Sequence, residues 1–247
     1  MNNLVSIITP SYNCEAFISD TIASVISQNY KNWEMLIVDD CSTDNSTNII
    51  NNFIKDDERI KLILNDRNEG AAVSRNKAIK AAKGKYVAFL DSDDLWGKDK
   101  LEKQIDFMEK NNIALSYTSC ELVDESGVKL NKVITPVEKL DYKEMLKENQ
   151  IACLTAIYNA ELIGKFYMPL IRKRQDYGLW LSILKKIPYA YKAPGILALY
   201  RVRSGSVSSN KVELLKYNFK LFHEHENLSR LKSLQCVVWN VYRKLKK

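Results

Sequence analysis

Three carboxylates stand within four positions at the end of a mostly apolar run, in the stretch YVAFLDSDDLW (86–96). Like charges this close together repel one another, and burying them without partners is costly. Two carboxylates on one loop can instead hold a hard divalent cation, which substrate phosphates often complete. We therefore expect Asp91 and Asp93 to serve a metal and phosphate site. Asp94 either joins them or caps the helix that follows.

Together with the run 91–94, four polar clusters follow apolar runs that are typical of buried strands. In chain order the clusters are residues 10–13 after the run 4–9, residues 39–40 at the end of 34–40, residues 68–70 after 60–64, and residues 91–94 after 86–90. Helical patterns over 15–28, 44–55 and 71–83 separate these runs. The alternation predicts parallel strands joined by right-handed crossovers, with a ligand crevice beyond their carboxyl ends. The four clusters should therefore converge on one site.

The alternation weakens after residue 111. Strand patterns cover 113–124 and 151–159, a turn is expected over 125–131, and a short helix is expected over 141–149. A helical pattern around 172–184 carries Asp176 near its start, and a strand from 198 runs into a loop. Asp176 is either a functional carboxylate or a residue that the positive end of the helix dipole favours.

The basic charge of the chain is concentrated in its last part. Of the net charge of +7 on 247 residues, residues 211–247 contribute nine Lys and Arg against three Glu. The remainder is close to neutral, which argues against a nucleic-acid partner. An amphipathic helix is expected near the end, where Leu234, Val238, Val241 and Leu245 form a stripe beside Trp239 and Tyr242, with Arg243, Lys244, Lys246 and Lys247 following. It could lie on an anionic membrane or pack on the body or on a partner subunit.

Cysteine usage and the N-terminus indicate a cytoplasmic protein. The five cysteines are odd in number and widely spaced, and the chain has no CxxC pair and only two His. This pattern argues against a zinc site and suits a reducing compartment. The start MNNLVSIITP is not typical of a signal peptide, and no window approaches 18 consecutive apolar residues. We expect a cytoplasmic location, or a peripheral one on the inner face of the cytoplasmic membrane through the tail.

Four segments in this order resemble the family 2 glycosyltransferases. They are VSIITPSYNCEAFISDTIASVISQNY (5–30), LIVDDCSTDNS (36–46), NEGAAVSRNKAIKAAKGKYVAFLDSDD (68–94) and QDYGLWLSILKK (175–186). The resemblance spans about residues 4–208 and implies an α/β chain of the GT-A fold, with a mostly parallel central sheet flanked by helices. It implies a domain over 1–210, with a nucleotide-sugar half (1–110) and an acceptor and base half (111–210), before the basic helical tail (211–247).

The resemblance also implies roles for individual residues. A nucleotide-diphospho-sugar, most often a UDP-hexose in this family, and a divalent cation (Mn²⁺ or Mg²⁺) would bind at the rim. Asp93 would bind the metal, and Asp176 would be the catalytic base of an inverting transfer. The donor nucleotide would contact Thr9, Pro10, Tyr12 (by stacking), Asp40 (accepting from the base), Arg75, Asp91 and Ser92. Two purely structural alternatives stay open. In one, Asp39 caps the next turn, and in the other, Arg75 forms a surface salt bridge.

Two positions depart from the family pattern. Gln175 stands where the family often has Glu, so a second carboxylate role is missing there. Arg203 stands where a His is frequent, and a guanidinium cannot act as a neutral metal ligand. We interpret Arg203 as a contact to the diphosphate.

The expected reaction is a single displacement, in which Asp176 takes the proton of an acceptor hydroxyl as that hydroxyl attacks the anomeric carbon. Metal and arginine would offset the charge that grows on the leaving diphosphate. The acceptor implied by the resemblance is a growing surface polysaccharide or a lipid-linked oligosaccharide. One alternative is a non-catalytic nucleotide-sugar-binding protein, which the presence of both Asp93 and Asp176 disfavours. Another is an aspartyl-phosphate phosphotransferase, which would need an Asp-x-Asp-x-Thr after the first strand, and IITPSYN has none.

Overall fold

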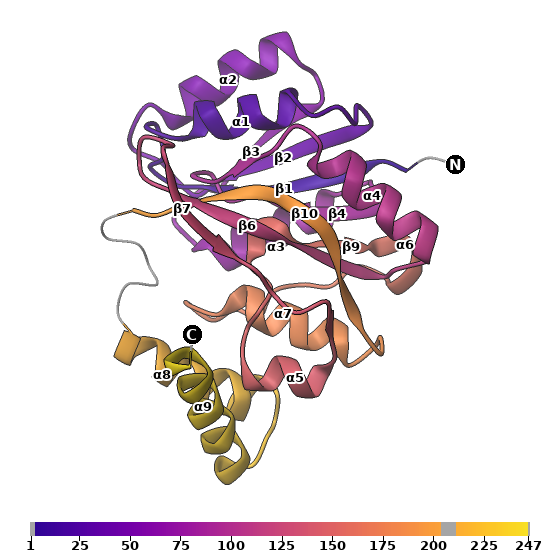
Figure 1. Cartoon of the computed structure of the whole chain (residues 1–247). Helices are drawn as coiled ribbons and strands as arrows, with labels where there is room; N and C mark the ends of the chain where they lie inside the picture. Colours follow the sequence, from indigo (N-terminus) through magenta and orange to yellow (C-terminus); the bar gives the residue numbers. More distant parts are fainter. Residues whose placement is uncertain (1–2, 204–210, 247) are drawn as a thin grey trace.

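The computed structural model describes residues 3–203 and 211–246. Within them, a mixed sheet has the strand order β3-β2-β1-β4-β9-β6-β10-β5, with β7 paired to β6 and β8 paired to β10. One face of the sheet is covered by α1, α2 and α4, and the other by α3, α5 and α7 (Figure 1). This is the mostly parallel, helix-flanked architecture that the sequence predicts.

The first half of the chain is a regular strand–helix alternation. Its parallel strands are β1 (Val5–Ser11), β2 (Trp33–Asp39), β3 (Ile60–Leu64) and β4 (Tyr86–Phe89), and its helices are α1 (Ile18–Ile26), α2 (Ser46–Asp56) and α3 (Ala71–Ala81). The residues of β1, β2 and β4 are almost all buried, because helices cover both faces of a parallel sheet. In register, Ser11 lies opposite Asp39, and Asp39 lies opposite Leu64. The polar residues that follow these strands are therefore neighbours.

The second half is less regular. Its elements are β5 (Leu95–Trp96), α4 (Lys100–Asn111), β6 (Leu115–Val123), β7 (Lys129–Ile134), β8 (Lys139–Leu140), α5 (Tyr142–Lys147), a 3₁₀ turn (Cys153–Thr155), β9 (Ile157–Asn159), α6 (Ala160–Ile163), α7 (Gln175–Leu184) and β10 (Ala190–Arg201). The short strand β9 pairs antiparallel with both β4 and β6, so it joins the two halves of the sheet.

Three expectations for the second half are wrong in extent. The strand expected over 151–159 is a 3₁₀ turn followed by the short β9. Residues 129–131, expected in a turn, belong to β7. The last strand begins at Ala190 instead of 198, because Pro194 and Gly195 lie in an irregular part of the ladder between β10 and β6, where the register shifts. Gly195 has a φ of 100°, a conformation that favours glycine, so a pattern typical of a loop is accommodated inside a strand.

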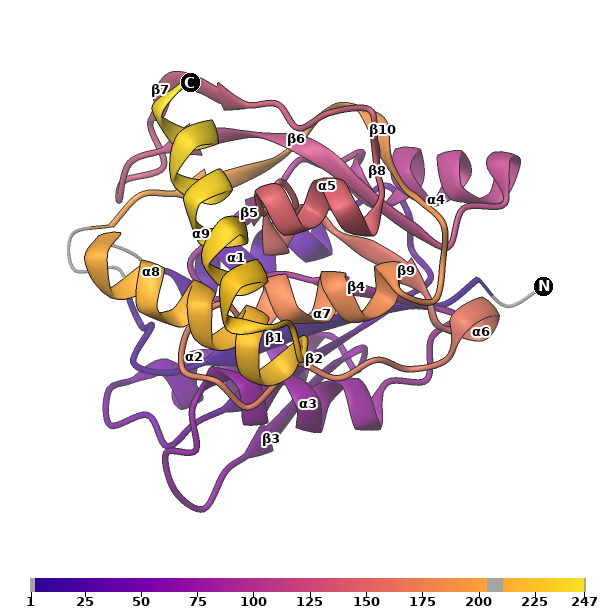
Figure 2. The ribbon, with the colours of Figure 1, turned by 90° about the horizontal axis from the view of Figure 1, so that it is seen from below.

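The C-terminal part is helical, as expected, and lies against α5 and α7 (Figure 2). It consists of α8 (Lys211–Lys220), a π-helical turn (Leu221–His225) and α9 (Arg230–Leu245). The ring of Phe222 meets that of Tyr177 edge to face, with centroids 5.7 Å apart. The Nδ2 atom of Asn240 in α9 donates to the carbonyl oxygen of Leu146 at 3.0 Å. One face of α9 is thereby fixed to the body.

The apolar stripe predicted on α9 is exposed, except that Val241 is partly buried. Val238 is 59% exposed and Leu245 is 82% exposed, and Leu234, Trp239 and Tyr242 are exposed as well. The residues that pack are a different set, namely Ser233, Cys236, Val237 and Asn240. Among the described residues, no helix combines the length and hydropathy needed to cross a bilayer.

Lys100 is a fully buried lysine at the start of α4. Its Nζ atom donates to Gln104 Oε1 at 2.6 Å and to the carbonyl oxygen of Thr155 at 3.4 Å, and it lies 4.7 Å from the centroid of the Trp96 ring. In the described part of the chain it has no carboxylate partner within 4.0 Å. Burial lowers the pKa of Lys100 to about 7.

This burial predicts a pH-dependent stability. Between about pH 7 and 10.5 the unfolded lysine holds a proton that the folded one has lost, so the free energy of unfolding rises with pH. The slope from this one group is at most about 1.4 kcal/mol per pH unit. Replacing Lys100 by Met should remove that contribution, as measured by urea unfolding between pH 7.5 and 9.5. Lys103→Met, on the exposed side of the same helix, should keep the wild-type slope, and an equal slope in both variants would contradict the assignment.

Candidate active site

The carboxyl ends of β1 to β4 form one rim. Backbone hydrogen bonds continue past the strands, from Asp40 N to the oxygen of Ser11 (2.8 Å) and from Asn65 N to the oxygen of Asp39 (2.9 Å). A third runs from Leu90 N to the oxygen of Ile8 at 3.1 Å. The polar clusters expected to converge do lie side by side.

Asp39 caps the turn after β2. Its Oδ1 accepts from the backbone nitrogen of Ser42 at 2.8 Å, and its Oδ2 accepts from the hydroxyls of Ser42 (2.6 Å) and Ser11 (2.9 Å). The alternative that assigned this carboxylate to the turn is confirmed. The same contacts hold the loop after β1 against the loop after β2.

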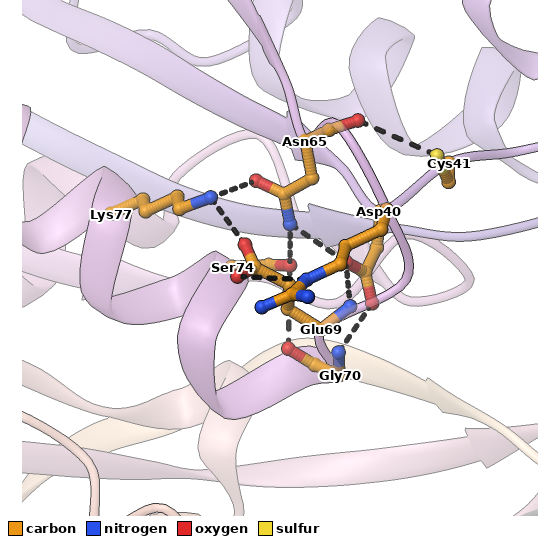
Figure 3. A network of polar contacts seen from close by, with 8 residues as sticks. Asp40, Cys41, Asn65, Glu69, Gly70, Ser74 and Lys77 are labelled. Carbon is orange, nitrogen blue, oxygen red and sulfur yellow. Dashed lines mark hydrogen bonds and ion pairs between the residues drawn. The ribbon is translucent and has the colours of Figure 1, made fainter.

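Asp40 holds the loop that begins α3 (Figure 3). Its Oδ1 accepts from the backbone nitrogen of Glu69 at 2.8 Å and from Asn65 Nδ2 at 2.7 Å, and its Oδ2 accepts from the backbone nitrogen of Gly70 at 2.7 Å. Gly70 has a φ of 87°, which favours glycine at this bend. Sequence reasoning missed this structural role, and the contact of Asp40 with a nucleobase stays a prediction.

Residues expected in the nucleobase pocket lie at the end of β1. The Oγ1 atom of Thr9 is buried and has no hydrogen-bond partner within the described ranges, although buried hydroxyls are normally paired. Tyr12 is 50% exposed, so its ring presents a surface on which a base could stack. Pro10 lies between them and is partly buried.

Arg75 of α3 bridges the rim and the start of α7. Its Nη2 atom lies 2.5 Å from Asp91 Oδ1, and its Nη1 atom donates to Gln175 Oε1 at 2.9 Å. Only 12% of the side chain is exposed, so the surface salt bridge considered as an alternative is wrong. Burial by itself would lower the pKa of this guanidinium, but the Asp91 carboxylate raises it above its ordinary value. The bridge places the residue after Gln175, which is Asp176, beside the rim at the carboxyl ends of β1 to β4.

The acidic run 91–94 is met by arginines from distant parts of the chain. Arg203 Nε lies 2.6 Å from Asp93 Oδ2, and the backbone nitrogen of Arg201 donates to Asp94 Oδ1 at 2.9 Å. Asp94 is therefore bound to β10, and the alternative in which it caps the next helix is wrong, because β10 runs directly beside β5 and Asp99 is the residue that precedes α4. Burial, followed by repulsion from neighbouring carboxylates, raises the pKa of Asp93 and raises that of Asp94 well above its ordinary value. The cluster would thus gain from further positive charge.

Asp91 and Asp93 are suited to a divalent cation whose coordination is completed by substrate oxygens. The arginine contacts use Oδ1 of Asp91 and Oδ2 of Asp93, which leaves the second oxygen of each carboxylate outside these ion pairs. Within residues 3–203 and 211–246, no three His, Cys, Asp or Glu side chains gather as a complete protein cage. Mg²⁺ commonly binds through one or two carboxylates together with substrate phosphates, which is the arrangement these residues can offer. Ser92, expected near the donor, lies between them and is partly buried.

Asp176 is the second residue of α7 and is partly buried. Asn149 Nδ2 donates to its Oδ2 atom at 3.1 Å. The expected helix start at 172 is wrong by three residues, because Arg174 has a left-handed conformation and α7 begins at Gln175.

Burial raises the pKa of the nearby Cys153 thiol well above its usual value, with further contributions from Asp91 and Asp176.

Three contacts of this site were missed by sequence reasoning. They are the hydrogen bond from Asn149 to Asp176, the acceptance of an Arg75 hydrogen bond by Gln175, and the contacts of Arg201 with Asp93 and Asp94. Arg201 belongs to the segment YRVR, in which the sequence pattern assigned a role only to Arg203. No pattern in the sequence distinguishes Asn149.

Comparison with known proteins gives consistent matches. Residues 6–167 match the family described as glycosyl transferase family 2. TuaG of Bacillus subtilis, whose name assigns it to teichuronic acid biosynthesis, is 48% identical over 235 residues, which is 95% of this chain and 93% of that protein. WfgD of Escherichia coli is named UDP-Glc:alpha-D-GlcNAc-diphosphoundecaprenol beta-1,3-glucosyltransferase. It is 45% identical over 214 residues, which is 86% of this chain and 83% of that protein.

Solved structures support the fold. TarS (residues 1–349) from S. aureus in complex with UDP-GlcNAc superposes with a TM-score of 0.72 at 21% identity, over 94% of this chain and 70% of that chain. The mannosyltransferase PcManGT of Pyrobaculum calidifontis, in complex with GDP-Man and Mn²⁺, gives a TM-score of 0.68 at 16% identity, over 92% of this chain and 65% of that chain.

The Asp40 network predicts a stability effect that is separable from nucleotide binding. Asp40→Asn replaces one acceptor oxygen by an amide NH₂ group, which cannot accept from the backbone N–H groups that it faces. Because these donors lose a partner, the free energy of unfolding should fall by about 1–3 kcal/mol. Urea unfolding without nucleotide should show this loss. The exposed Asp66→Asn, in the same loop, should leave the free energy of unfolding unchanged. An Asp40→Asn protein as stable as the wild type would contradict the structural role.

Proposed function

This chain belongs to glycosyl transferase family 2, and from that premise we propose that it transfers glucose from UDP-glucose to a sugar carried on undecaprenyl diphosphate, in the synthesis of a surface polysaccharide. The observation that carries the proposal is the Arg75 bridge, which joins the rim residue Asp91 to the start of α7 and so to Asp176. The proposed donor site and the proposed catalytic base are therefore adjacent. WfgD, which is named for such chemistry, is matched over 83% of its length.

The donor half supplies contacts for UDP. The unpaired Thr9 hydroxyl and the exposed Tyr12 ring lie where a nucleobase would enter, at the end of β1. Arg203 is near enough to Asp93 to contact a diphosphate bound there. Asp91 and Asp93 would hold a divalent cation, which when bound supplies positive charge against the charge on the leaving diphosphate. The Mn²⁺ in the structure of PcManGT supports this assignment.

The transfer itself is a single displacement with inversion. Asp176 accepts the proton of the acceptor hydroxyl while that oxygen forms the new bond to the anomeric carbon. The bond from the anomeric carbon to the diphosphate breaks, and the electron pair leaves with UDP. Asn149 and the Arg75–Gln175 contact orient the start of α7 and hold the carboxylate in place.

A lipid-linked acceptor requires the enzyme to work at a membrane surface, and α9 offers a face for it. Its exposed stripe includes Leu234, Val238 and Leu245, and Lys232, Lys244 and Lys246 belong to the same segment. Apolar side chains beside lysines match an anionic lipid surface. We place α9 on that surface, on the inner face of the cytoplasmic membrane.

Asp176→Asn tests the assignment of the base. The amide keeps the shape of the side chain but cannot take the proton, so the transfer rate should fall about 10²–10⁴-fold. Calorimetry on the same protein should show UDP-glucose affinity within a few-fold of the wild type. Near wild-type turnover would remove Asp176 as the base, and loss of donor binding would assign it to the nucleotide site instead.

Chelation tests the metal assignment by a binding readout. UDP affinity, measured by calorimetry, should fall at least tenfold when EDTA replaces Mn²⁺, because the diphosphate loses its bridging charge. Asp93→Ala should bind UDP weakly in both conditions. Asp106→Ala, an exposed carboxylate on α4, is the control and should respond to Mn²⁺ as the wild type does. Unchanged UDP affinity of the wild type in EDTA would exclude a metal at this site.

Vesicle binding tests the assignment of α9. Replacing Leu234, Val238 and Leu245 by Ser alters the exposed stripe and leaves the packed face intact. This variant should lose most of its co-sedimentation with phosphatidylglycerol vesicles. A control with Ser at the exposed Leu64, Val128 and Leu170 should sediment like the wild type. Equal sedimentation of both variants would refute the proposal.

A further inference from the structure

Two arginines that precede Asp176 in the sequence form no close ion pair within the described residues, although the charge of Arg172 contributes to lowering the pKa of Glu213 in α8. Within residues 3–203, Arg172 and Arg174 have no carboxylate oxygen within 4.0 Å. The other arginines of this part of the chain each have one, namely Arg59, Arg67, Arg75, Arg201 and Arg203. The two unpaired guanidiniums therefore stand four and two residues before the carboxylate assigned as the base.

The segment that carries these arginines is held in place by other contacts. Lys173, between them, is 9% exposed and lies 2.6 Å from Glu213 of α8. Arg174 has φ 69° and ψ 24°, an uncommon conformation for a residue with a side chain, and its carbonyl oxygen accepts from Gly178 N at 3.0 Å. Its Nε atom is buried without a partner among the described residues. The lysine anchors the segment, and the arginines keep their hydrogen-bonding capacity.

The proposed acceptor contains an anion that these arginines can reach, so the inference rests on the proposed function. In the substrate named for WfgD, the sugar that receives glucose at its 3-position is attached directly to the diphosphate. One pyranose ring thus separates the attacked hydroxyl from the first phosphate. The chain allows Cα separations from Asp176 of at most about 7 Å for Arg174 and about 14 Å for Arg172. An arginine side chain is long enough to cover much of the remaining distance to a diphosphate that is attached to a sugar lying over Asp176.

The diphosphate of the donor is assigned elsewhere. In an inverting displacement the leaving diphosphate departs opposite the attacking hydroxyl, so the base and its neighbours belong to the acceptor side. The donor side already has Asp91 and Asp93 after β4, and Arg203, which follows β10 and contacts Asp93. Arginine also suits phosphate better than lysine does, because its planar group binds two oxygens at once.

We propose that Arg172 and Arg174 form the site that binds the diphosphate of the lipid-linked acceptor. In this arrangement the sugar next to the diphosphate lies over Asp176, and the lipid extends away from the catalytic centre. The diphosphate would fix which hydroxyl of that sugar faces the base, so the two arginines select both the acceptor and the position of transfer.

The test compares two short acceptors on the full-length enzyme saturated with UDP and Mn²⁺, so that the donor site is closed to the added diphosphate. One is GlcNAc α-linked through diphosphate to a short alkyl chain, and the other is the same alkyl glycoside without diphosphate. By calorimetry, the wild type should bind the diphosphate form at least tenfold more tightly. The double variant Arg172→Gln/Arg174→Gln should lose that advantage and bind the neutral glycoside unchanged. Arg230→Gln, an exposed arginine of α9, is the matched control and should bind both as the wild type does.

Three results would overturn the inference: equal binding of both acceptors by the wild type, an undiminished diphosphate advantage in the double variant, or loss of UDP affinity in that variant. A transfer assay separates this inference from the proposed function. If the arginines govern diphosphate binding but no glucose is transferred, the site stands and the proposed transfer fails. If glucose is transferred equally well to both acceptors, the transfer stands and the site is wrong.

Discussion

The guanidinium of Arg75 is the constraint on which the site depends. A largely buried arginine is tolerated only when its charge and its donors are met, and here the partners are Asp91 from the loop after β4 and Gln175 from the start of α7. These partners are far apart in the chain and come from its two halves. Satisfying one buried cation therefore holds the start of α7 against the rim at the carboxyl ends of β1 to β4. The position of Arg75 is set in turn by Asp40, whose hydrogen bonds fix the first turn of α3.

Arginine contacts also bring β10 to the acidic loop. Arg201 contacts the backbone oxygen of Asp93 and the side chain of Asp94, and Arg203 contacts the side chain of Asp93. The carboxylates that sequence reasoning assigned to a metal are therefore already compensated in part by protein cations. The raised pKa of Asp93 shows that this compensation is incomplete, as burial and the Asp91 charge outweigh the arginines. A site of this kind is suited to a substrate that brings its own cation and phosphates.

The sequence predicts the rim well and the contacts between the halves poorly, for a physical reason. Strand period and parallel register place the residues after β1 to β4 together, and both can be recognised from local patterns. The partners of Asp94 and Gln175 depend on where β10 and α3 lie in space, which no local pattern records. The same holds for α9, where the stripe was correctly predicted to be apolar but the residues that pack are the smaller ones on the other face. The GT-A fold and the enzyme class followed from the ordered motifs, while the roles of individual site residues stay predictions.

The most direct test of the Arg75 bridge is a double-mutant cycle on transfer activity between Asp91→Asn and Gln175→Leu. Both residues touch the same guanidinium, so their effects on kcat/KM should be non-additive by about 0.5–3 kcal/mol. The same cycle in an Arg75→Met background should show no coupling, because the shared partner is gone. Additive effects in the presence of Arg75, within about 0.5 kcal/mol, would contradict the claim that this arginine couples Asp91 to the start of α7.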